Sequence, residues 1–405
     1  MVQNVFAGKK VVIGVSGSIA AFKVAGWVSD LTKEEANISV VMTSSAGEFV
    51  TPLTFAALSG NEVHTEMFGR DKEDPMAHIG LGRDADLVLI APATANIIAK
   101  LACGIADDLL TTMVLVTRAP VIVCPAMNSR MYNHPTTQRN IMTLKDIGYN
   151  IIDPACGMMA CKEEGEGRLP EWNGVKEQLA QKLSPQDLQG LKIMVTAGPT
   201  REPLDPARFL SNRSSGKMGY ALAQAARRRG AQVLLISGPS SLVCPPKVTL
   251  LKVQTALEMY DAVLTHAANF SVIIKAAAVA DYRPATIYQH KVKKEQITRE
   301  LLLERNPDIL LELGKRKKEG QILVGFAAES KNLMEEGRRK LLNKNLDLIA
   351  VNDISGKFTG FETESNQLLL ISASGSETLP HTSKLHSADL LLDRVQQLLC
   401  LNPTD

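Results

Sequence analysis

The stretch "LKIMVTAG" (191–198), followed after one loop by "SNRSSGKMGYALAQAARRRG" (211–230), shows the unit from which the fold is built. Its apolar run predicts a buried strand, and the second stretch predicts a helix that begins near Gly216. Gly216 and the lysine after it resemble the end of a P-loop. That motif also needs a glycine five positions before Gly216 and a hydroxyl residue after the lysine, and the chain has Ser211 and Met218 there. We therefore exclude a P-loop, although a helix N-terminus at this point still attracts anions.

The same alternation of strand and helix runs through both halves of the chain. Nearly continuous apolar runs are typical of parallel strands that are buried on both faces. In the first half the expected strands are 9–15, 37–43, 86–93, 119–126 and 149–154, with helices expected over 18–34 and 51–60. In the second half they are 192–198, 232–237, 248–253, 271–278, 322–329 and 346–353, with an antiparallel hairpin over 366–380 and helices over 256–268 and 387–399.

These patterns predict an α/β protein with two doubly wound, Rossmann-like domains in series. The polar stretch "KLSPQDLQG" (182–190) reads as the connection between them. We expect a first domain over 1–185, a linker over 186–190 and a second domain over 191–405.

The composition excludes several function classes. The chain has 405 residues, a net charge of +2 and 4% aromatic residues, which argues against wrapping a nucleic acid or stacking its bases. It has no apolar run of membrane-spanning length and no apolar signal region at its start. Six scattered cysteines fit a reducing compartment, so we expect a cytoplasmic protein. A small phosphorylated ligand remains compatible with this charge.

Three segments of the first half follow expected strands, where ligands collect in open α/β sheets. They are "GVSGSIAAFK" (14–23), "APATAN" (91–96) and "PAMNSRMYNHP" (125–135). "DPMAHIGLGRDAD" (74–86) and the Gly-rich "ACGMMACKEEGEGRLP" (155–170) accompany them. Each also has an ordinary interpretation, since glycine is common in strand–helix turns and an asparagine before a helix is a frequent cap. The two cysteines of the Gly-rich segment have no second pair at zinc-ligand spacing.

Together, in this order, these segments resemble the flavin-containing cysteine decarboxylases; "PAMNSRMY" and "ACKEEGEGR" are the most specific. The resemblance implies FMN as cofactor, and it implies catalytic roles for His78, for Asn128 on the substrate carboxylate, and for Cys161 as proton donor. The implied flavin-binding residues are Gly17, Ser18, Ser44, Pro92, Ala93, Thr94, Asn96 and Met127.

Two positions depart from the pattern of that family. Tyr132 stands where the family usually has tryptophan, and "ACKE" stands where it has "ACGD", which places Lys162 and Glu163 in the Gly-rich segment. Because Lys162 replaces a glycine, the departure bears on the flexibility of this segment.

The second half resembles the phosphopantothenate–cysteine ligases, which commonly follow the flavin domain in bacterial bifunctional enzymes of coenzyme A biosynthesis. The resemblance rests on residues 195–223, "KAAAVADYRP" (275–284), "KVKK" (291–294), "NPDIL" (306–310), "VGFAAE" (324–329), residues 338–353 and "GF" (360–361). It implies that CTP and Mg²⁺ are used, that Asn212 and Lys291 are catalytic residues, with Asn212 binding an acyl-cytidylate intermediate, and that Arg208 lies near the substrate. The implied CTP-binding residues are Lys275, Ala276, Ala277, Asp281, Lys291, Pro307, Asp308, Ile309, Leu310, Phe326, Lys340 and Lys344.

The spacing of the lysines agrees with this role, although solvated surface lysines have the same spacing. Lys291 and Lys293 would share one face of an extended strand, and Lys340 and Lys344 would share one face of a helix. The metal ligands themselves are not identified by the sequence.

The sequence thus favours an enzyme that joins 4′-phosphopantothenate to cysteine with CTP and then decarboxylates the product to 4′-phosphopantetheine with FMN. The family implies a homo-oligomer, with trimers of the flavin domain and dimers of the ligase domain, as in a dodecamer. A flavin-dependent oxidoreductase fused to a nucleotide-binding domain, and a non-catalytic flavoprotein, are the alternatives.

Overall fold

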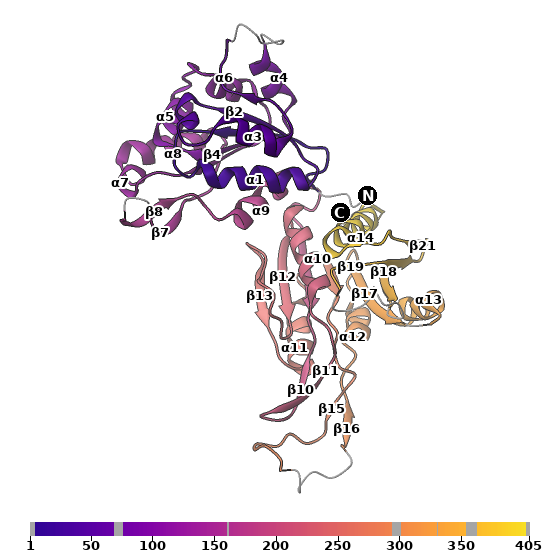
Figure 1. The fold of residues 1–405 in the computed structure, drawn as a ribbon. Helices are drawn as coiled ribbons and strands as arrows, with labels where there is room; N and C mark the ends of the chain where they lie inside the picture. Colours follow the sequence, from indigo (N-terminus) through magenta and orange to yellow (C-terminus); the bar gives the residue numbers. More distant parts are fainter. Residues whose placement is uncertain are drawn as a thin grey trace. The chain divides into compact units, whose positions relative to one another are not determined.

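The chain folds into two compact units, residues 3–184 and residues 185–405. The computed structural model describes residues 5–68, 76–159, 162–293, 301–329, 331–353 and 363–401. Figure 1 follows the chain from the indigo first unit to the yellow C-terminal helix. Within these ranges no helix combines the length and apolar character that crossing a membrane requires.

The first unit contains a six-stranded sheet in which every neighbouring pair is parallel, with the strand order β3-β2-β1-β4-β5-β6. Its strands are β1 (Lys10–Val15), β2 (Asn37–Met42), β3 (Val63–His64), β4 (Leu87–Ala93), β5 (Val121–Pro125) and β6 (Asn150–Ile151). The helices are α1 (Ala21–Lys33), α2 (Ser44–Gly47), α3 (Pro52–Ser59), α4 (Ala77–Asp84), α5 (Ala95–Cys103), α6 (Leu109–Val116), α7 (Ser129–Tyr132), α8 (Pro135–Asp146) and α9 (Trp172–Leu183). A separate antiparallel hairpin joins β7 (Ala155–Met158) to β8 (Glu164–Arg168).

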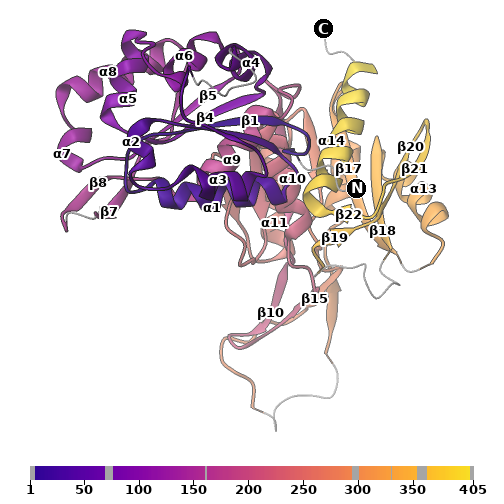
Figure 2. The same cartoon turned by 45° about the horizontal axis from the view of Figure 1, so that its top comes forward.

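Alternate residues of the strands enter two cores, one on each face of this sheet. Ile13 of β1 packs with α1, α3 and α9, whereas its neighbour Val12 packs with α5, α6 and α8. Figure 2 shows these helix groups on opposite sides of β1 and β4. Two-sided burial explains why the strands read as continuous apolar runs.

The second unit has an eight-stranded sheet with the order β13-β12-β9-β14-β17-β18-β20-β21. The strands are β9 (Lys192–Ala197), β12 (Gln232–Ser237), β13 (Thr249–Lys252), β14 (Val272–Lys275), β17 (Ile322–Glu329), β18 (Leu348–Asp353), β20 (Leu368–Ser372) and β21 (Gly375–Thr378). Only β20 and β21 run antiparallel to their neighbours. The helices are α10 (Lys217–Arg228), α11 (Ala256–Ala267), α12 (Ile309–Arg316), α13 (Leu333–Asn343) and α14 (Lys384–Leu401). The predicted doubly wound α/β class is therefore confirmed for both units, as is the hairpin within 366–380.

Three further antiparallel strand pairs of the second unit were not predicted. They pair β10 (Arg201–Asp205) with β11 (Arg208–Ser211), β15 (Tyr282–Pro284) with β16 (Leu303–Arg305), and β19 (Ser365–Asn366) with β22 (Thr382–Ser383). β10 and β15 lie side by side (Figures 1 and 2). The strand expected at Lys291 and Lys293 is not present: both residues are described, and neither belongs to a strand. The argument that the two lysines share one face of a strand therefore fails.

The expected linker, residues 186–190, packs against the second unit. Leu188 is fully buried in the core that contains α10 and α14. Asp187 accepts hydrogen bonds from the buried Arg229 guanidinium at 2.9 and 2.5 Å, and Arg229 also contacts the Asp393 carboxylate at 2.7 Å. Arg229 thus ties this segment to α14 through two carboxylates. The domain boundaries expected from the sequence, 1–185, 186–190 and 191–405, stay a prediction.

We expect Arg229→Ala to destabilise the second unit by about 1.5–3 kcal/mol, because the buried guanidinium loses its charge-assisted bonds to two partly exposed carboxylates. Both tryptophans, Trp27 and Trp172, lie in the first unit and stack at 5.1 Å. In urea denaturation, the circular-dichroism transition of the second unit should therefore move to lower urea while the tryptophan fluorescence transition stays in place.

The matched control is Arg339→Ala, which removes an exposed pair with Glu336 and should cost no more than about 1 kcal/mol. Equal effects of the two substitutions would show that Arg229 does not hold this segment.

Candidate functional site

The predicted flavin-binding segments of the first unit meet at one edge of its sheet. Gly17 and Ser18 follow β1, Ser44 begins α2 after β2, and the "APATAN" segment covers the end of β4. β2, β1, β4 and β5 are consecutive neighbours, and the strand order reverses between β1 and β4. This is the topological switch point, where open α/β sheets bind ligands.

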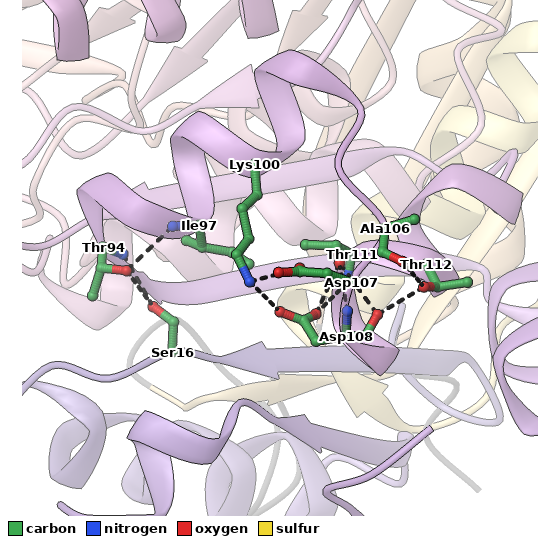
Figure 3. A network of polar contacts seen from close by, with 9 residues as sticks. All are labelled: Ser16, Thr94, Ile97, Lys100, Ala106, Asp107, Asp108, Thr111 and Thr112. Carbon is green, nitrogen blue, oxygen red and sulfur yellow. Dashed lines mark hydrogen bonds and ion pairs between the residues drawn. The ribbon is translucent and has the colours of Figure 1, made fainter. Parts of the chain in front are cut away.

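Hydrogen bonds fix the turns after β1 and β4 against each other. The Ser16 hydroxyl donates to the Pro92 carbonyl at 2.7 Å and accepts from the Thr94 backbone N–H at 3.0 Å. The Thr94 hydroxyl in turn accepts from the backbone N–H of Ile97 at 3.4 Å, so Thr94 caps α5 (Figure 3). A buried serine therefore holds the N-terminus of α5 at the switch point.

The far end of α5 is held by a polar network. Lys100 donates to the carboxylates of Asp107 at 2.7 Å and Asp108 at 3.0 Å (Figure 3). Asp108 also caps α6 by accepting from the Thr111 backbone N–H at 2.9 Å. Burial on its own would raise the pKa of Asp108, but the bonds from Thr111 and Lys100 lower it. Both ends of α5 are thus fixed by side-chain hydrogen bonds.

A cavity of about 420 Å³ opens beside the turns after β1 and β5. It brings together three of the predicted residues, Ser18, Met127 and Asn128. The remaining walls are largely apolar and come from α1, from the segment after β5 and from the β7–β8 hairpin: Ile19, Ala20, Phe22, Lys23, Ala126, Met158, Met159, Gly167, Arg168 and Leu169. A largely apolar cavity with a few polar groups is typical of a cofactor or substrate site.

Asn128 both caps a helix and lines the cavity. Its side-chain oxygen accepts from the Arg130 backbone N–H at 2.9 Å, and its side-chain nitrogen donates to the Glu163 carboxylate at 3.1 Å. Glu163 also lies 3.6 Å from the Arg130 guanidinium. The capping interpretation and the binding interpretation are therefore compatible, because they use different atoms of one side chain.

The β7–β8 hairpin packs directly on the backbone that carries Asn128. The Met127 N–H donates to the Gly167 carbonyl at 2.9 Å, and a Cβ on Gly167 would lie 2.1 Å from the Met127 carbonyl oxygen. Lys162, which replaces a glycine of the family pattern, has a φ of 63°. The departure therefore places a side chain in a left-handed conformation that favours glycine. Cys161 lies outside the described residues.

The remaining predicted residues of the first unit do not line this cavity. His78 lies on α4, and its Nδ1 is buried with no hydrogen-bond partner among the described residues. Gly17 packs against α2, where a Cβ would approach the Ser45 Cβ to 2.5 Å. Ser44, Pro92, Ala93, Thr94 and Asn96 lie at the neighbouring strand ends. The fold gathers these segments at one sheet edge, and His78 lies outside the lining of the cavity to which Asn128 belongs.

In the second unit, α10 begins at the predicted position. Gly216 caps it with a φ of 83°, and Lys217 is its first residue. The helix approaches β9 closely, because a Cβ on Gly219 would lie 2.5 Å from the Ala197 Cβ and 2.9 Å from the Thr196 carbonyl oxygen. Its N-terminus therefore faces the carboxyl edge of the sheet.

A cavity of about 430 Å³ lies at this edge, between α10 and the ends of β14, β17 and β18. Five lysines line it: Lys217, Lys275, Lys340, Lys344 and Lys384. An adjoining cavity of about 360 Å³ shares Lys275, Asp281 and Lys344 with it and adds Pro307, Asp308 and Ile309. The predicted residues Asn212, Ala276, Ala277 and Phe326 also line the larger cavity, so most of the predicted CTP-binding set meets here.

Electrostatics in this cavity favour an anionic ligand. Burial, followed by the nearby Lys344 charge, lowers the pKa of Lys275 to about 8, although Asp308 and Asp281 oppose the shift. Lys344 contacts the Asp308 carboxylate at 2.8 Å, and Lys340 contacts Glu329 at 2.5 Å. Carboxylates thus compensate only part of the positive charge, and a polyanion would compensate the rest.

Three predicted residues lie outside the lining of both cavities. Lys291 is exposed, and Leu310 is buried in the core beneath α12. The Arg208 guanidinium donates to Asp205 at 3.0 Å and to the Val292 carbonyl at 3.0 Å, which ties the segment of Lys291 to the β10–β11 hairpin. The bond from Arg208, together with backbone N–H groups that donate to the same carboxylate, lowers the pKa of Asp205.

Sequence reasoning missed Lys217 and Lys384 as members of the site. Lys217 directly follows Gly216, the cap of α10, and this position at a helix N-terminus could have indicated that it binds an anion. Lys384 belongs to no motif, and only the tertiary fold brings it to the cavity.

Comparisons with known proteins match a different family to each of the two halves of the chain. Residues 3–184 match the family described as Flavoprotein, and residues 188–399 match the family described as DNA/pantothenate metabolism flavoprotein C-terminal domain. The coenzyme A biosynthesis bifunctional protein CoaBC of Vibrio vulnificus (strain CMCP6) is 46% identical over 98% of this chain and 100% of its own length.

The protein of the same name from Bacillus subtilis (strain 168) is also 46% identical, over 97% of each chain. Among solved structures, the C-terminal domain of a coenzyme A biosynthesis bifunctional protein CoaBC is 42% identical, covers 53% of this chain and 98% of its own, and has a TM-score of 0.46.

Proposed function

The chain belongs to the family of bifunctional coenzyme A biosynthesis enzymes, and on that premise we propose that it carries out two consecutive reactions. The second unit joins 4′-phosphopantothenate to cysteine with CTP, and the first unit decarboxylates the product to 4′-phosphopantetheine. The observation that carries this proposal is the cavity lined by five lysines at the carboxyl edge of the second sheet. It suits a triphosphate and a phosphorylated acid, in a chain whose other unit matches a flavoprotein family.

In the proposed ligase reaction, a carboxylate oxygen of phosphopantothenate attacks the α-phosphorus of CTP and pyrophosphate leaves. The cysteine amine then attacks the acyl carbon of the cytidylate, and CMP leaves. Lys275, Lys340 and Lys344 would neutralise the phosphate oxygens, on which negative charge increases as pyrophosphate departs. Asn212, whose side-chain nitrogen donates to the Ala278 carbonyl at 3.0 Å, would bind the acyl-cytidylate from the same cavity. Mg²⁺ would be carried by the phosphates.

In the proposed decarboxylase reaction, the residues of the first unit bind and orient. The turn after β1, with no side chain at Gly17, and the capped N-terminus of α5 offer backbone N–H groups to a phosphate, so the switch point fits FMN. Bound FMN would supply the electron-accepting chemistry that a cysteine carboxylate lacks. Asn128 would hold the substrate carboxylate from the cavity wall. Cys161 is proposed as the proton donor and His78 as a catalytic residue, both from the resemblance.

Incubation of the full chain with 4′-phosphopantothenate, cysteine, CTP and Mg²⁺, with the products identified by mass, tests the proposal. The absorbance spectrum of the purified protein and the mass of any released flavin test the cofactor. Formation of pyrophosphate, CMP, CO₂ and 4′-phosphopantetheine would support both reactions, whereas hydride transfer without CO₂ release would favour an oxidoreductase. We also propose that the protein is located in the cytoplasm and forms a homo-oligomer.

Asn128→Asp separates capping from substrate binding. Aspartate caps a helix as well as asparagine does. It also replaces the donor to Glu163 by a second carboxylate, which at this exposed contact should cost no more than about 1 kcal/mol of stability. The added negative charge would repel the substrate carboxylate. We expect decarboxylation of supplied phosphopantothenoylcysteine to fall about tenfold to a hundredfold, as for the loss of a charge-assisted hydrogen bond. CO₂ release and thermal unfolding are the measurements, and CTP-dependent pyrophosphate release is the internal control. Unchanged CO₂ release would leave Asn128 as a cap only.

Lys275 should make CTP binding dependent on pH. Its pKa of about 8 means that its charge is present below pH 8 and is lost as the pH rises through that value. CTP affinity should therefore fall between pH 7 and pH 9.5. Lys275→Gln should weaken binding at pH 7 by about tenfold to a hundredfold and flatten this profile. Titration calorimetry with wild-type protein and variant checks both. An identical pH profile in the variant would exclude Lys275.

Lys291 is a residue for which the family resemblance and the cavity lining give different answers. The resemblance assigns it to CTP, whereas it lies outside the cavity lining. We expect Lys291→Gln to reduce CTP-dependent pyrophosphate release about tenfold or more, because a phosphate would lose a charged donor. Lys293→Gln, two residues away and also exposed, is the matched control and should retain activity. Equal activity of the two variants would remove Lys291 from the site.

A further inference from the structure

The Glu163 carboxylate contacts the side-chain nitrogen of Asn128, the group that the proposed function assigns to the substrate carboxylate. The Asn128 nitrogen donates to Glu163 at 3.1 Å, and the Arg130 guanidinium lies 3.6 Å from the same carboxylate. An amide N–H and a guanidinium are also the groups with which proteins hold the carboxylate of a ligand. Glu163 therefore has the surroundings that a bound substrate carboxylate would require.

The other end of the Asn128 amide decides which atom a ligand can use. The side-chain oxygen accepts from the Arg130 backbone N–H at 2.9 Å and so caps α7. An oxygen cannot donate to a carboxylate, and only the nitrogen of an amide carries N–H groups. A carboxylate that approaches Asn128 from the cavity must therefore use the nitrogen that Glu163 contacts.

The backbone of the β7–β8 hairpin holds Glu163 at this place. The Met159 N–H donates to the Glu163 carbonyl at 2.9 Å, and β8 begins at the residue after Glu163. β8 lies beside α7 (Figures 1 and 2). A Cβ on Gly165 would lie 3.0 Å from the Ser129 Cβ, so the absence of a side chain permits this close approach, as it does at Gly167. The contact between Glu163 and Asn128 thus follows from how the hairpin packs.

The contact is of a kind that a ligand can displace. The Glu163 side chain is 44% exposed and that of Arg130 is 86% exposed, and solvent weakens ion pairs at such exposure. Position 163 is also one of the departures from the family pattern, because glutamate is one methylene longer than the aspartate of "ACGD". The added length extends the reach of a carboxylate that starts from this hairpin.

We propose that Glu163 competes with the substrate carboxylate for the Asn128 amide and thereby sets the affinity of the decarboxylase site for carboxylate ligands. Two carboxylates at one amide nitrogen repel each other, so a substrate must displace Glu163 before Asn128 can bind it. The decarboxylated product has no such group and leaves the contact in place. Glu163 thus weakens the binding of substrate but not of product. The inference rests on the proposed function, which brings the substrate carboxylate to Asn128.

The test uses two ligands that differ only in the carboxylate, N-(4′-phosphopantothenoyl)serine and its decarboxylated counterpart N-(4′-phosphopantothenoyl)ethanolamine. In both, a hydroxyl replaces the substrate thiol, which separates binding from turnover. The flavin absorbance of the FMN-loaded full chain follows each titration, because it reports on the first unit. The variant is Glu163→Gln, which removes the charge and keeps the shape. Glu164→Gln removes the same charge from the next residue, which is also exposed, and is the matched control.

We expect Glu163→Gln to strengthen binding of the serine ligand about twofold to fivefold, the effect of one exposed charge contact, and to leave the ethanolamine ligand unchanged. Glu164→Gln should match the wild type for both ligands. Unchanged or weaker binding of the serine ligand to Glu163→Gln would overturn the proposal. An equal gain for both ligands would also overturn it, since the substitution would then act through the hairpin. So would an equal gain in Glu164→Gln, which would show a general effect of charge.

A failure of the proposed function gives a different result. A wild-type protein that releases no CO₂ from phosphopantothenoylcysteine would refute the decarboxylase reaction. The titrations would still decide the role of Glu163, because they do not depend on turnover. A wild-type protein that decarboxylates, together with an unchanged affinity of Glu163→Gln for the serine ligand, would refute this inference alone. A wild-type protein that binds neither ligand would refute both.

Discussion

Burial of a parallel sheet on both faces is the constraint on which both sites depend. Once helices cover the two faces, only the strand ends remain accessible, and in a parallel sheet the carboxyl ends lie along one edge. In the first unit, Ile13 and Val12 enter opposite cores, so β1 has no free face. The turn after β1 is then the first place where this strand can contact a ligand. The same holds for β9 and β14 in the second unit.

The two edges carry opposite kinds of chemistry. The cavity of the first unit is walled by methionine, isoleucine and phenylalanine side chains and has few charges. Such walls exclude water from a planar, uncharged ring system. The cavity of the second unit holds five lysines, three of them paired with the carboxylates of Glu329, Asp308 and Glu364. A ligand with several negative charges can replace those carboxylates as partner. One architecture thus serves two reactions through the residues that follow its strands.

Local patterns predicted the sheets because their strands are locally determined. The runs at 232–237 and 322–329 coincide with β12 and β17. The β15–β16 hairpin escaped prediction because it pairs Tyr282 with Arg305 across a long connection and contains Pro284. The site residues likewise fall into those that a local motif predicts and those that only tertiary packing brings together. Asn128 and Lys275 stand in motifs directly after strands, whereas Lys384 reaches its cavity only through the packing of α14 on α10.

The lowered pKa values give the lysine cavity a further property. Lys275 and Lys384 both have a pKa of about 8, chiefly because burial disfavours their charged forms. An arriving phosphate favours the ammonium form and raises these pKa values, so binding above pH 8 is accompanied by proton uptake and weakens as the pH rises. A neutral ligand of the same shape would gain nothing from this coupling. The cavity therefore distinguishes ligands by charge as well as by fit, and burial of its lysines, which destabilises the empty protein, is the source of that selectivity.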